Sequence, residues 1–427
     1  MRCTKQFTRL QMKVRNSFLK KHKLITSLFL FAFLFFSCKN ADDNALIIWT
    51  NNAELLPYIE LFNKTHETKK ALLLYKENPA RELEKKQDAV DVVIAPFLHT
   101  AKTEIFFKPL DCIFDCTSLS KRKLYRGLLS AGKIKNRTYL LPVSFNLSAF
   151  LFAKDKAALL PNEKTITLNE AKKRAIDFNE GNERFTKLGF AVQENENFLY
   201  FVAKMQNAQF KQAKEIFLWN KKNLDASVSF LADWIKTANG SAKREQDFIY
   251  KYLFMPNYKQ GVAGNTLFSY AESRELFLLS ESDLQAVDFR WLSDGEKILV
   301  TDDMIQVGIP KNAKHTNDAK QFLEWFFDAK VQEQFLEIEK NANRSLAIAG
   351  GFSALIETNE KSAKPYQPFF FLNPPPRNVS QAKFVLPARW NEMKNTIVLP
   401  YLSDVVSNAN GAKVSLEERI TNWLKGK

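Results

Sequence analysis

The sequence predicts an α/β fold of two lobes joined by several chain crossings. Residues 45–95 alternate short apolar strand patterns with helical patterns, which is typical of a parallel sheet flanked by helices. The apolar stretch Tyr139–Phe152 is interrupted by Pro142, Ser144 and Asn146, which suits two strands and a crossing. The chain of 427 residues is long enough for two domains.

The first predicted strands end in residues that could face a ligand. Ala45–Thr50 and Asp91–Ala95 have the apolar pattern of buried strands, with another strand and two helical segments between them. Asn51 and Asn52 follow the first of these strands, and Pro96 follows the second. Open α/β sheets bind ligands at the carboxyl ends of their strands, so these residues are candidate contacts. The two asparagines could instead only cap the next helix.

The first crossing is predicted within the stretch that contains Pro142. Tyr139–Leu141 would end in one sheet and Leu147–Phe152 would begin another. Ser144 and Asn146 then lie where the chain passes between the lobes, and both are candidate ligand contacts. The alternative is an ordinary buried strand with a proline at its start.

A polar turn is predicted further along the chain. Leu188–Val192 has the pattern of a short strand, and an apolar helix is expected over Phe198–Met205. Gln193 and Glu194 open the turn between them, where amide and carboxylate groups suit a ligand with hydroxyl groups. The turn could equally be a solvated loop.

Two later segments are predicted as further crossings. Gly261–Tyr270 contains two glycines, which allow the backbone conformations of a hinge. Leu299–Pro310 is apolar in its second half and precedes one long amphipathic helix over Asp318–Glu339. The proline-rich residues Lys364–Arg377 are predicted to form an extended loop.

The N-terminus has the features of a secretory signal. Residues 1–37 carry basic residues and then a short apolar run over Leu24–Phe36, which suits a signal peptide better than a membrane span. Ser37 and Cys38 resemble a relaxed bacterial lipobox, in which Cys38 receives the lipid. The alternative is a secretory signal in which Cys38 is incidental.

Cys112 and Cys116 are the remaining cysteines beyond Cys3 and Cys38. In an oxidising compartment they could close a small disulfide or remain free thiols. A metal site would need two further ligands, and His99 is the only nearby histidine, so no metal and no cofactor are predicted.

Neither an enzyme nor a nucleic-acid-binding protein is predicted. The sequence has no G-x-S-x-G, H-E-x-x-H or G-x-G-x-x-G motif. The adjacent carboxylates Asp302 and Asp303 would point to opposite faces of a strand, so they could not easily flank one glycosidic bond. The net charge of +15 includes eight Lys and Arg residues within residues 1–38, and no dense basic stripe follows.

Segments spread over about residues 45 to 425 resemble one family, the bacterial extracellular solute-binding proteins of family 1. These are the maltose-binding-protein-like sugar binders of ABC importers. Their first and third strands are similar to Trp49–Asn52 and Asp91–Pro96, and their first crossing to the LPVSFN segment at 141–146. The most specific resemblance lies over residues 305–326. There a strand is followed by the motif I-P-K-N and then by A-x-x-F-L-x-W-F, as in the family.

The resemblance implies the two-lobed periplasmic-binding-protein fold, each lobe a mixed, mainly parallel sheet flanked by helices. It places the N-terminal lobe at residues 45–143 and 265–307. The C-terminal lobe would comprise residues 144–264 and 308–427, and residues 38–44 would be a tether.

The same resemblance adds aromatic residues to the candidate site. It implies that Trp390 lies over a bound sugar, and it makes Tyr270 and Trp291 candidates, although Trp291 suits the core better. The function implied is that of a lipid-anchored, extracytoplasmic and monomeric binding protein that delivers a small solute, most readily a carbohydrate, to an ABC permease. The alternatives are a surface lipoprotein for adhesion or sensing, and a binder of a polyamine or peptide.

Overall fold

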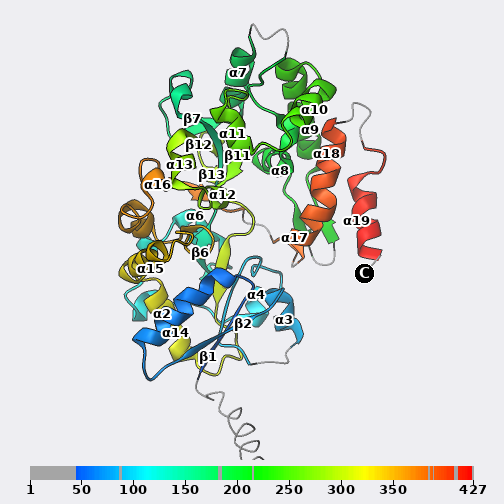
Figure 1. The fold of residues 1–427 in the computed structure, drawn as a ribbon. Coiled ribbons are helices and arrows are strands. Elements are labelled where there is room, and N and C mark those ends of the chain that lie inside the picture. The colour runs from blue at the N-terminus through cyan, green and yellow to red at the C-terminus, as the bar shows by residue number, and fades with distance from the viewer. Residues whose placement is uncertain are drawn as a thin grey trace, which may run out of the picture.

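The computed structural model describes residues 45–85, 89–180, 185–213, 216–382, 385–387, 389–407 and 412–425. The predicted signal peptide, Cys38 and the tether lie outside these residues. Figure 1 shows two lobes, with the sheet that contains β1 and β2 below and the sheet that contains β7 and β12 above. Among the described residues, no helix is both long and apolar enough to span a bilayer.

The first lobe is built on a six-stranded sheet. Strands β1 and β2 pair in parallel, β1 and β3 pair in parallel, and β14 runs antiparallel to both β3 and β6. Valine, isoleucine and leucine fill these strands, and β3 and β6 are buried at every residue, as expected for strands covered on both faces. The order across the sheet is β15 (Phe352–Ser353), β6 (Leu141–Phe145), β14 (Ile305–Gly308), β3 (Val92–Ala95), β1 (Leu46–Thr50) and β2 (Ala71–Tyr75).

Helices from both parts of the chain pack on this sheet. Tyr58 of α2 stacks on Phe335 of α15 with 3.7 Å between ring centroids, and it also contacts Phe326 of α14. The helices of this lobe are η1 (Ala53–Leu55), α2 (Leu56–Thr65), α3 (Pro79–Lys85), α4 (Thr103–Phe106), α5 (Ile113–Cys116), η2 (Lys121–Lys123), α6 (Arg126–Ala131), α14 (Thr316–Phe326), α15 (Ala329–Asn341) and η5 (Thr358–Ser362).

The second lobe is built on a four-stranded sheet. Strand β7 is buried at all six residues and pairs antiparallel with both β11 and β12. The order is β11 (Ser269–Glu272), β7 (Ser148–Ala153), β12 (Val287–Ser293) and β8 (Thr165–Thr167). The described residues also form three two-stranded ladders: β4 (Lys133–Ile134) with β5 (Arg137–Thr138), β9 (Lys211–Ala213) with β10 (Ile216–Leu218), and β13 (Ile298–Leu299) with β16 (Val379–Ser380).

An aromatic core holds the helices of the second lobe. The rings of Phe150, Phe190, Phe198 and Trp234 lie 4.7 to 5.8 Å apart, and all four are fully buried. The helices are η3 (Lys154–Leu159), α7 (Leu168–Asn179), η4 (Val192–Glu194), α8 (Glu196–Met205), α9 (Lys221–Asn239), α10 (Ala242–Lys251), α11 (Asn257–Val262), α12 (Ser273–Leu276), α13 (Glu281–Ala286), α16 (Pro368–Phe371), α17 (Trp390–Met393), η6 (Lys394–Val398), α18 (Leu399–Ser407) and α19 (Leu416–Lys425).

The chain passes between the two sheets at three places. It leaves the first sheet through Asn146 and Leu147, between β6 and β7, as the sequence predicted. It returns through residues 300–304, before β14, which confirms the predicted crossing within Leu299–Pro310. It leaves again between η5 of the first lobe and α16 of the second, through residues 363–367.

The sheets divide the chain differently from the predicted lobe boundaries. Residues 265–307 were assigned to the N-terminal lobe, but β11 and β12 pair with β7 of the second lobe. Gly261–Tyr270 is therefore not a crossing, because α11 and β11 both lie against β7. Residues 308–427 were assigned to the C-terminal lobe, yet α14 and α15 pack in the core of the first.

Two predicted elements also differ. Leu188–Val192 forms only a single bridge, between Leu188 and Thr266, because its backbone turns into η4. The long helix predicted over Asp318–Glu339 is two helices. Asp328 has extended backbone and its carboxylate accepts a hydrogen bond of 2.9 Å from the N–H of Lys330, which starts α15.

The break between α14 and α15 can be tested by removing this cap. We expect Asp328→Ala to lower the free energy of unfolding by about 1 kcal/mol in urea denaturation, and Asp328→Asn to cost much less. Glu337→Ala, on the exposed face of α15, is the control and should change little. If one helix ran through this position, alanine would stabilise it, because alanine is the better helix former.

Candidate functional site

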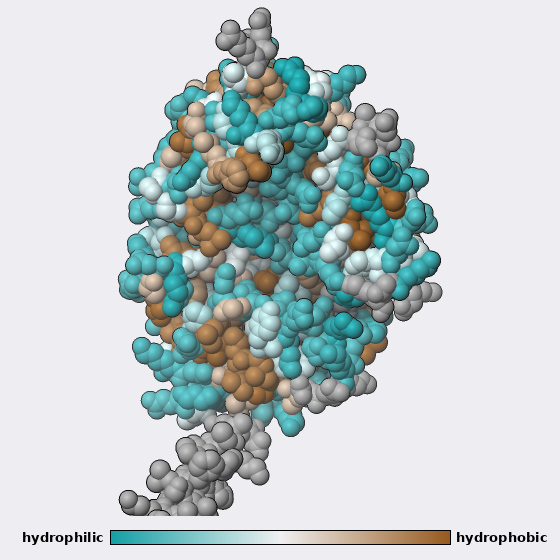
Figure 2. Space-filling model, turned by 45° about the vertical axis from the view of Figure 1, so that its right-hand side comes forward, coloured by the Kyte–Doolittle hydropathy of each residue, from teal (hydrophilic) through white to brown (hydrophobic). Residues whose placement is uncertain are grey.

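The two sheets meet at the ends of their strands, and this junction is the candidate site. Strands β1, β3 and β6 share one direction, so the residues that follow them lie at the same edge of the first sheet. Glu272, at the end of β11, pairs with Ser148 directly after the first crossing. Figure 2 shows a recessed, mostly hydrophilic face between the lobes.

Three of the predicted polar contacts are engaged with the loop before β15. Asn52 and Ser144 donate to the carbonyl of Ala349 at 2.9 and 3.0 Å. Asn146 donates to the carbonyl of Gly350 at 2.9 Å. Asn52 also accepts from the N–H of Glu54, as the capping alternative predicted. These side chains therefore shape the junction by fixing this loop, and the half-buried Asn51 and Pro96 flank them at the sheet edge.

Gln193 and Glu194 bond within the second lobe. Gln193 donates to the carbonyl of Ala242 at 3.1 Å, and Glu194 accepts from the side chain of Gln260 at 2.9 Å. Burial raises the pKa of Glu194. Glu245, which is completely buried and accepts from the backbone N–H of Gln193, has its pKa raised to about 7 by burial. The turn is thus held by a buried polar network.

The three predicted aromatic contacts lie in packed cores. Tyr270 is 4% exposed and its hydroxyl is 2.8 Å from that of Ser148. Trp291 is fully buried and donates to the carbonyl of Asn373 at 3.1 Å. Trp390 is fully buried as well, so the predicted platform over a ligand is wrong for this conformation. Its ring instead packs among the aromatic side chains of Tyr200, Phe210 and Phe217.

Trp390 contributes to a buried charged network at the second crossing. Its indole N–H donates to Asp302 at 2.9 Å, and the hydroxyl of Tyr200 donates to the same carboxylate. Lys204 of α8 forms an ion pair with Asp302 and donates to the carbonyl of Val300 at 2.6 Å. Burial alone would raise the pKa of Asp302, but the charge of Lys204 and these hydrogen bonds hold it below its usual range.

A second group of charged residues faces the junction. We call Glu54, Glu272, Arg274, Glu275, Asp303 and Lys394 the junction cluster. Glu54 belongs to the first lobe, and the others belong to the crossing or the second lobe. Arg274 donates to Glu272 at 2.9 Å and forms an ion pair with Asp303 at 2.5 Å. Lys394 lies over the ring of Tyr200, 5.2 Å from its centroid.

The electrostatics of the junction cluster differ from residue to residue. Burial raises the pKa of Glu54 and of Glu272, even though the charge of Arg274 opposes both shifts. Burial and the nearby charge of Glu272 raise the pKa of Glu275 to about 7. Arg274 lies close enough to Glu54 to influence it, so the two lobes face each other through opposite charges.

Only a small part of the charged groups at the junction could be recognised in the sequence. The pair Asp302 and Asp303 is visible, and its two side chains do point to different partners, although they lie in a turn and not in a strand. Arg274, Glu54 and Lys394 follow no motif and come from distant parts of the chain. Only the fold brings them together.

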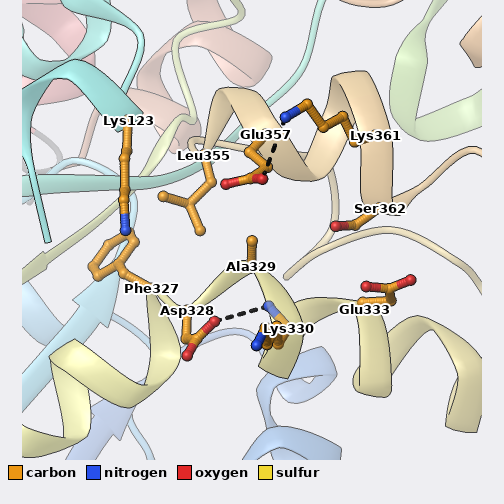
Figure 3. Close-up of a pocket in the computed structure, with 10 residues that line it drawn as sticks. All are labelled: Lys123, Phe327, Asp328, Ala329, Lys330, Glu333, Leu355, Glu357, Lys361 and Ser362. Atoms are coloured by element: carbon orange, nitrogen blue, oxygen red, sulfur yellow. Dashed lines mark hydrogen bonds and ion pairs between the residues drawn. The ribbon is translucent and has the colours of Figure 1, made fainter. Parts of the chain in front are cut away.

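One small cavity lies at the junction, and a larger one lies elsewhere on the first lobe. The small cavity, of about 30 Å³, lies between His99, Asp302 and Gln381, and it can hold one water molecule. The other, of about 460 Å³, is open to solvent on the first lobe (Figure 3). Its lining residues are Lys123, Phe327, Asp328, Ala329, Lys330, Glu333, Leu355, Glu357, Lys361 and Ser362. None of the predicted site residues lines this larger pocket. Two of its charged side chains, Lys361 and Glu357, form an ion pair with each other.

The described residues form neither a disulfide nor a metal site. Cys112 and Cys116 are exposed free thiols at either end of α5, which is the second of the two predicted alternatives. Within the described ranges, no group of three or more His, Cys, Asp or Glu side chains could hold a metal ion.

The buried ion pair at the second crossing predicts a large effect on stability. We expect Lys204→Met to lower the free energy of unfolding by about 3 to 5 kcal/mol, because it leaves the carboxylate of Asp302 buried without its cation. The double variant Lys204→Met, Asp302→Leu should recover most of this loss in a double-mutant cycle measured by denaturant unfolding. Equal losses in the single and double variants would contradict a coupled pair.

The raised pKa of Glu245 should make the stability of the protein depend on pH. Its folded pKa of about 7 lies above its ordinary value, so the folded state binds the proton more tightly than the unfolded state. This contribution is complete at low pH and is lost as the pH rises through about 7. We expect Glu245→Gln to remove on the order of 3 kcal/mol from the fall in unfolding free energy between pH 5 and pH 8. Unchanged pH dependence in the variant would contradict the assignment.

Solved structures with this fold bind sugars, although no family model and no curated protein matches the sequence. The sugar-binding protein MalE from Xanthomonas citri covers 90% of this chain and 96% of its own, with 11% identity and a TM-score of 0.61. The galacto-N-biose-/lacto-N-biose I-binding protein of an ABC transporter from Bifidobacterium longum, in complex with lacto-N-biose, covers 89% and 96%, with 15% identity and a TM-score of 0.56.

An ABC substrate-binding protein from Listeria monocytogenes, in complex with cycloalternan, covers 90% of this chain and 98% of its own, with 12% identity and a TM-score of 0.55. These neighbours are binding proteins rather than enzymes. The chain therefore has the two-lobed periplasmic-binding-protein fold of maltose-binding-protein-like solute-binding proteins.

Proposed function

We propose that this chain is the extracytoplasmic solute-binding component of an ABC import system and binds a carbohydrate between its lobes. The observation that carries the proposal is the match of the whole fold, over 88 to 90% of the chain, to proteins solved with sugars bound. The junction also has the hydrogen-bonding groups that sugar hydroxyls require, because carboxylates and a guanidinium lie at its walls.

The geometry supports binding by lobe closure. The crossings at Asn146–Leu147 and at residues 300–304 are short, and they pass directly beside the junction cluster. A solute that contacts Glu54 of the first lobe and Arg274 of the second would stabilise the closed arrangement more than the open one. Binding would then present a changed surface to a permease.

We infer that the protein binds its solute without chemical conversion. The neighbours with this fold are binding proteins, and the adjacent pair Asp302 and Asp303 is engaged by Lys204 and Arg274. Both carboxylates thus hold the crossing in place through their ion pairs. They do not face one another across a space in which a glycosidic bond could lie.

We also propose that the protein works as a monomer held to a bacterial membrane by a lipid on Cys38. The signal-like residues 1–37 and the lipobox-like Ser37 and Cys38 support the anchor. The partners would be the permease subunits of the importer, which receive the solute.

The proposal can be tested by calorimetric titration of the full chain in a polyoxyethylene detergent, which has no sugar headgroup to compete. We expect one or more sugars from a panel of mono- and oligosaccharides to bind. A hundredfold excess over the dissociation constant should stabilise the fold by about 2.7 kcal/mol. Folded protein that binds no sugar would contradict the proposal and favour a surface role in adhesion or sensing.

A matched pair of variants locates the site. Arg274→Lys keeps the charge but loses the planar donor fork, so we expect it to weaken sugar binding about tenfold. Arg377→Lys is the control, because Arg377 forms a two-point contact with Glu360 on the exposed surface, outside the junction cluster. Equal effects of the two variants on affinity would contradict binding at the junction.

A further inference from the structure

We propose that the solute bound at the junction carries a positively charged group, such as the ammonium of an amino sugar. This inference rests on the proposed function and narrows the class of solute. Its basis is the composition of the junction cluster, in which four carboxylates (Glu54, Glu272, Glu275 and Asp303) face two cations (Arg274 and Lys394). The formal charge is therefore 2 − 4 = −2, in a chain whose net charge is +15.

The cations of the cluster are already in use. Arg274 is shared by two carboxylates, those of Glu272 and Asp303, and it also donates to Thr301 at 3.5 Å. Lys394 is held over the ring of Tyr200 and contacts Asn197 at 3.4 Å. Among the described residues, no ion pair includes Glu54 or Glu275.

Other charged groups near the cluster do not supply the missing charge, because they neutralise each other. Asp302 is paired with Lys204 in the buried network of the second crossing. Glu339, which lies near Glu54, is held by Arg344 in a two-point contact of 2.6 and 2.8 Å. The excess of carboxylates thus belongs to the junction cluster itself.

The raised pKa values of the three glutamates agree with an unmet demand for a cation. The pKa of Asp303 is instead lowered, because its burial is outweighed by the charge of Arg274 and by hydrogen bonds. Burial disfavours the charged forms of Glu54 and Glu272, and the charge of Glu272 further disfavours that of Glu275. A bound ammonium would reverse this effect by hydrogen bonding to carboxylates in a partly buried site. A neutral sugar would leave the carboxylates in excess.

The placement of the carboxylates also couples charge to closure. Glu54 lies in η1, directly before α2 of the first lobe, whereas Glu272 and Glu275 lie on β11 and α12 of the second lobe. A cation between them attracts both lobes at once, so it favours the closed state over the open state.

The test is a titration of the full chain at pH 7.5 with solutes matched in shape but not in charge. The pairs are glucosamine with glucose, galactosamine with galactose, and the chitosan disaccharide with cellobiose. Spermidine is added as a cation without a sugar ring. We expect at least one amino sugar to bind ten times more tightly than its neutral partner.

Charge-neutral variants identify the groups responsible. We expect Glu54→Gln and Glu275→Gln each to weaken binding of the amino sugar five- to tenfold and to change the affinity of any neutral sugar less than twofold. Glu163→Gln is the matched control, because Glu163 is exposed before β8, at the far edge of the second sheet. Circular dichroism and a melting curve confirm that each variant is folded.

The outcomes separate this inference from the proposed function. Neutral sugars that bind as tightly as their amino partners would overturn the inference and leave the sugar-binding function intact. Binding of spermidine without any sugar would support the cationic solute and overturn the carbohydrate class. Folded protein that binds none of these solutes would overturn both.

Discussion

The buried carboxylate of Asp302 fixes the geometry on which the junction depends. It lies on the crossing that returns the chain to the first sheet, and its side-chain partners among the described residues all belong to the second lobe: Lys204, Tyr200 and Trp390. The start of the crossing is therefore part of the second lobe, and the conformational freedom between the lobes must lie elsewhere. Breaking such a pair costs far more than an exposed ion pair, because a charge is left buried.

The rest of the junction follows from this anchor. Asp303 is the next residue, and the fixed backbone directs it to Arg274, which in turn holds Glu272. On the other side, Asn52, Ser144 and Asn146 hold the loop at Ala349 and Gly350. Gly350 has a φ of +83°, and a side chain there would approach the carboxylate of Glu54. One wall is thus charged, and the other is built from hydrogen bonds to backbone.

Much of the fold could be predicted from the sequence, because local patterns specify it. The strands β1, β3, β6 and β7 have apolar runs bounded by polar residues, and Pro142 marks the first crossing. The lobe boundaries could not be predicted in the same way. The sequences of β11 (SYAE) and β12 (VDFRWLS) do not say which sheet they join, and only pairing with β7 assigns them.

The candidate site was predictable only in part, for a related reason. Ser144 and Asn146 lie at the first crossing, where the sequence places them, but their hydrogen bonds go to a loop about 200 residues away. Trp390 carries no sequence signal that separates a core ring from an exposed one. The cap at Asp328 was missed because the apolar periodicity of α14 continues into α15.

The order of segments in the first sheet has a consequence for how the protein acquires its structure. Strands β6 and β14 are neighbours, yet nearly all of the second sheet lies between them in the chain. The first lobe cannot complete its sheet until residues near Phe352 have been synthesised, whereas the strands of the second sheet are all present by Ser293. The second sheet can therefore form first, although its lobe is completed only when α17, α18 and α19 at the end of the chain pack against it. Contacts between such distant segments form slowly, so closure of the first sheet is expected to be a late step in folding.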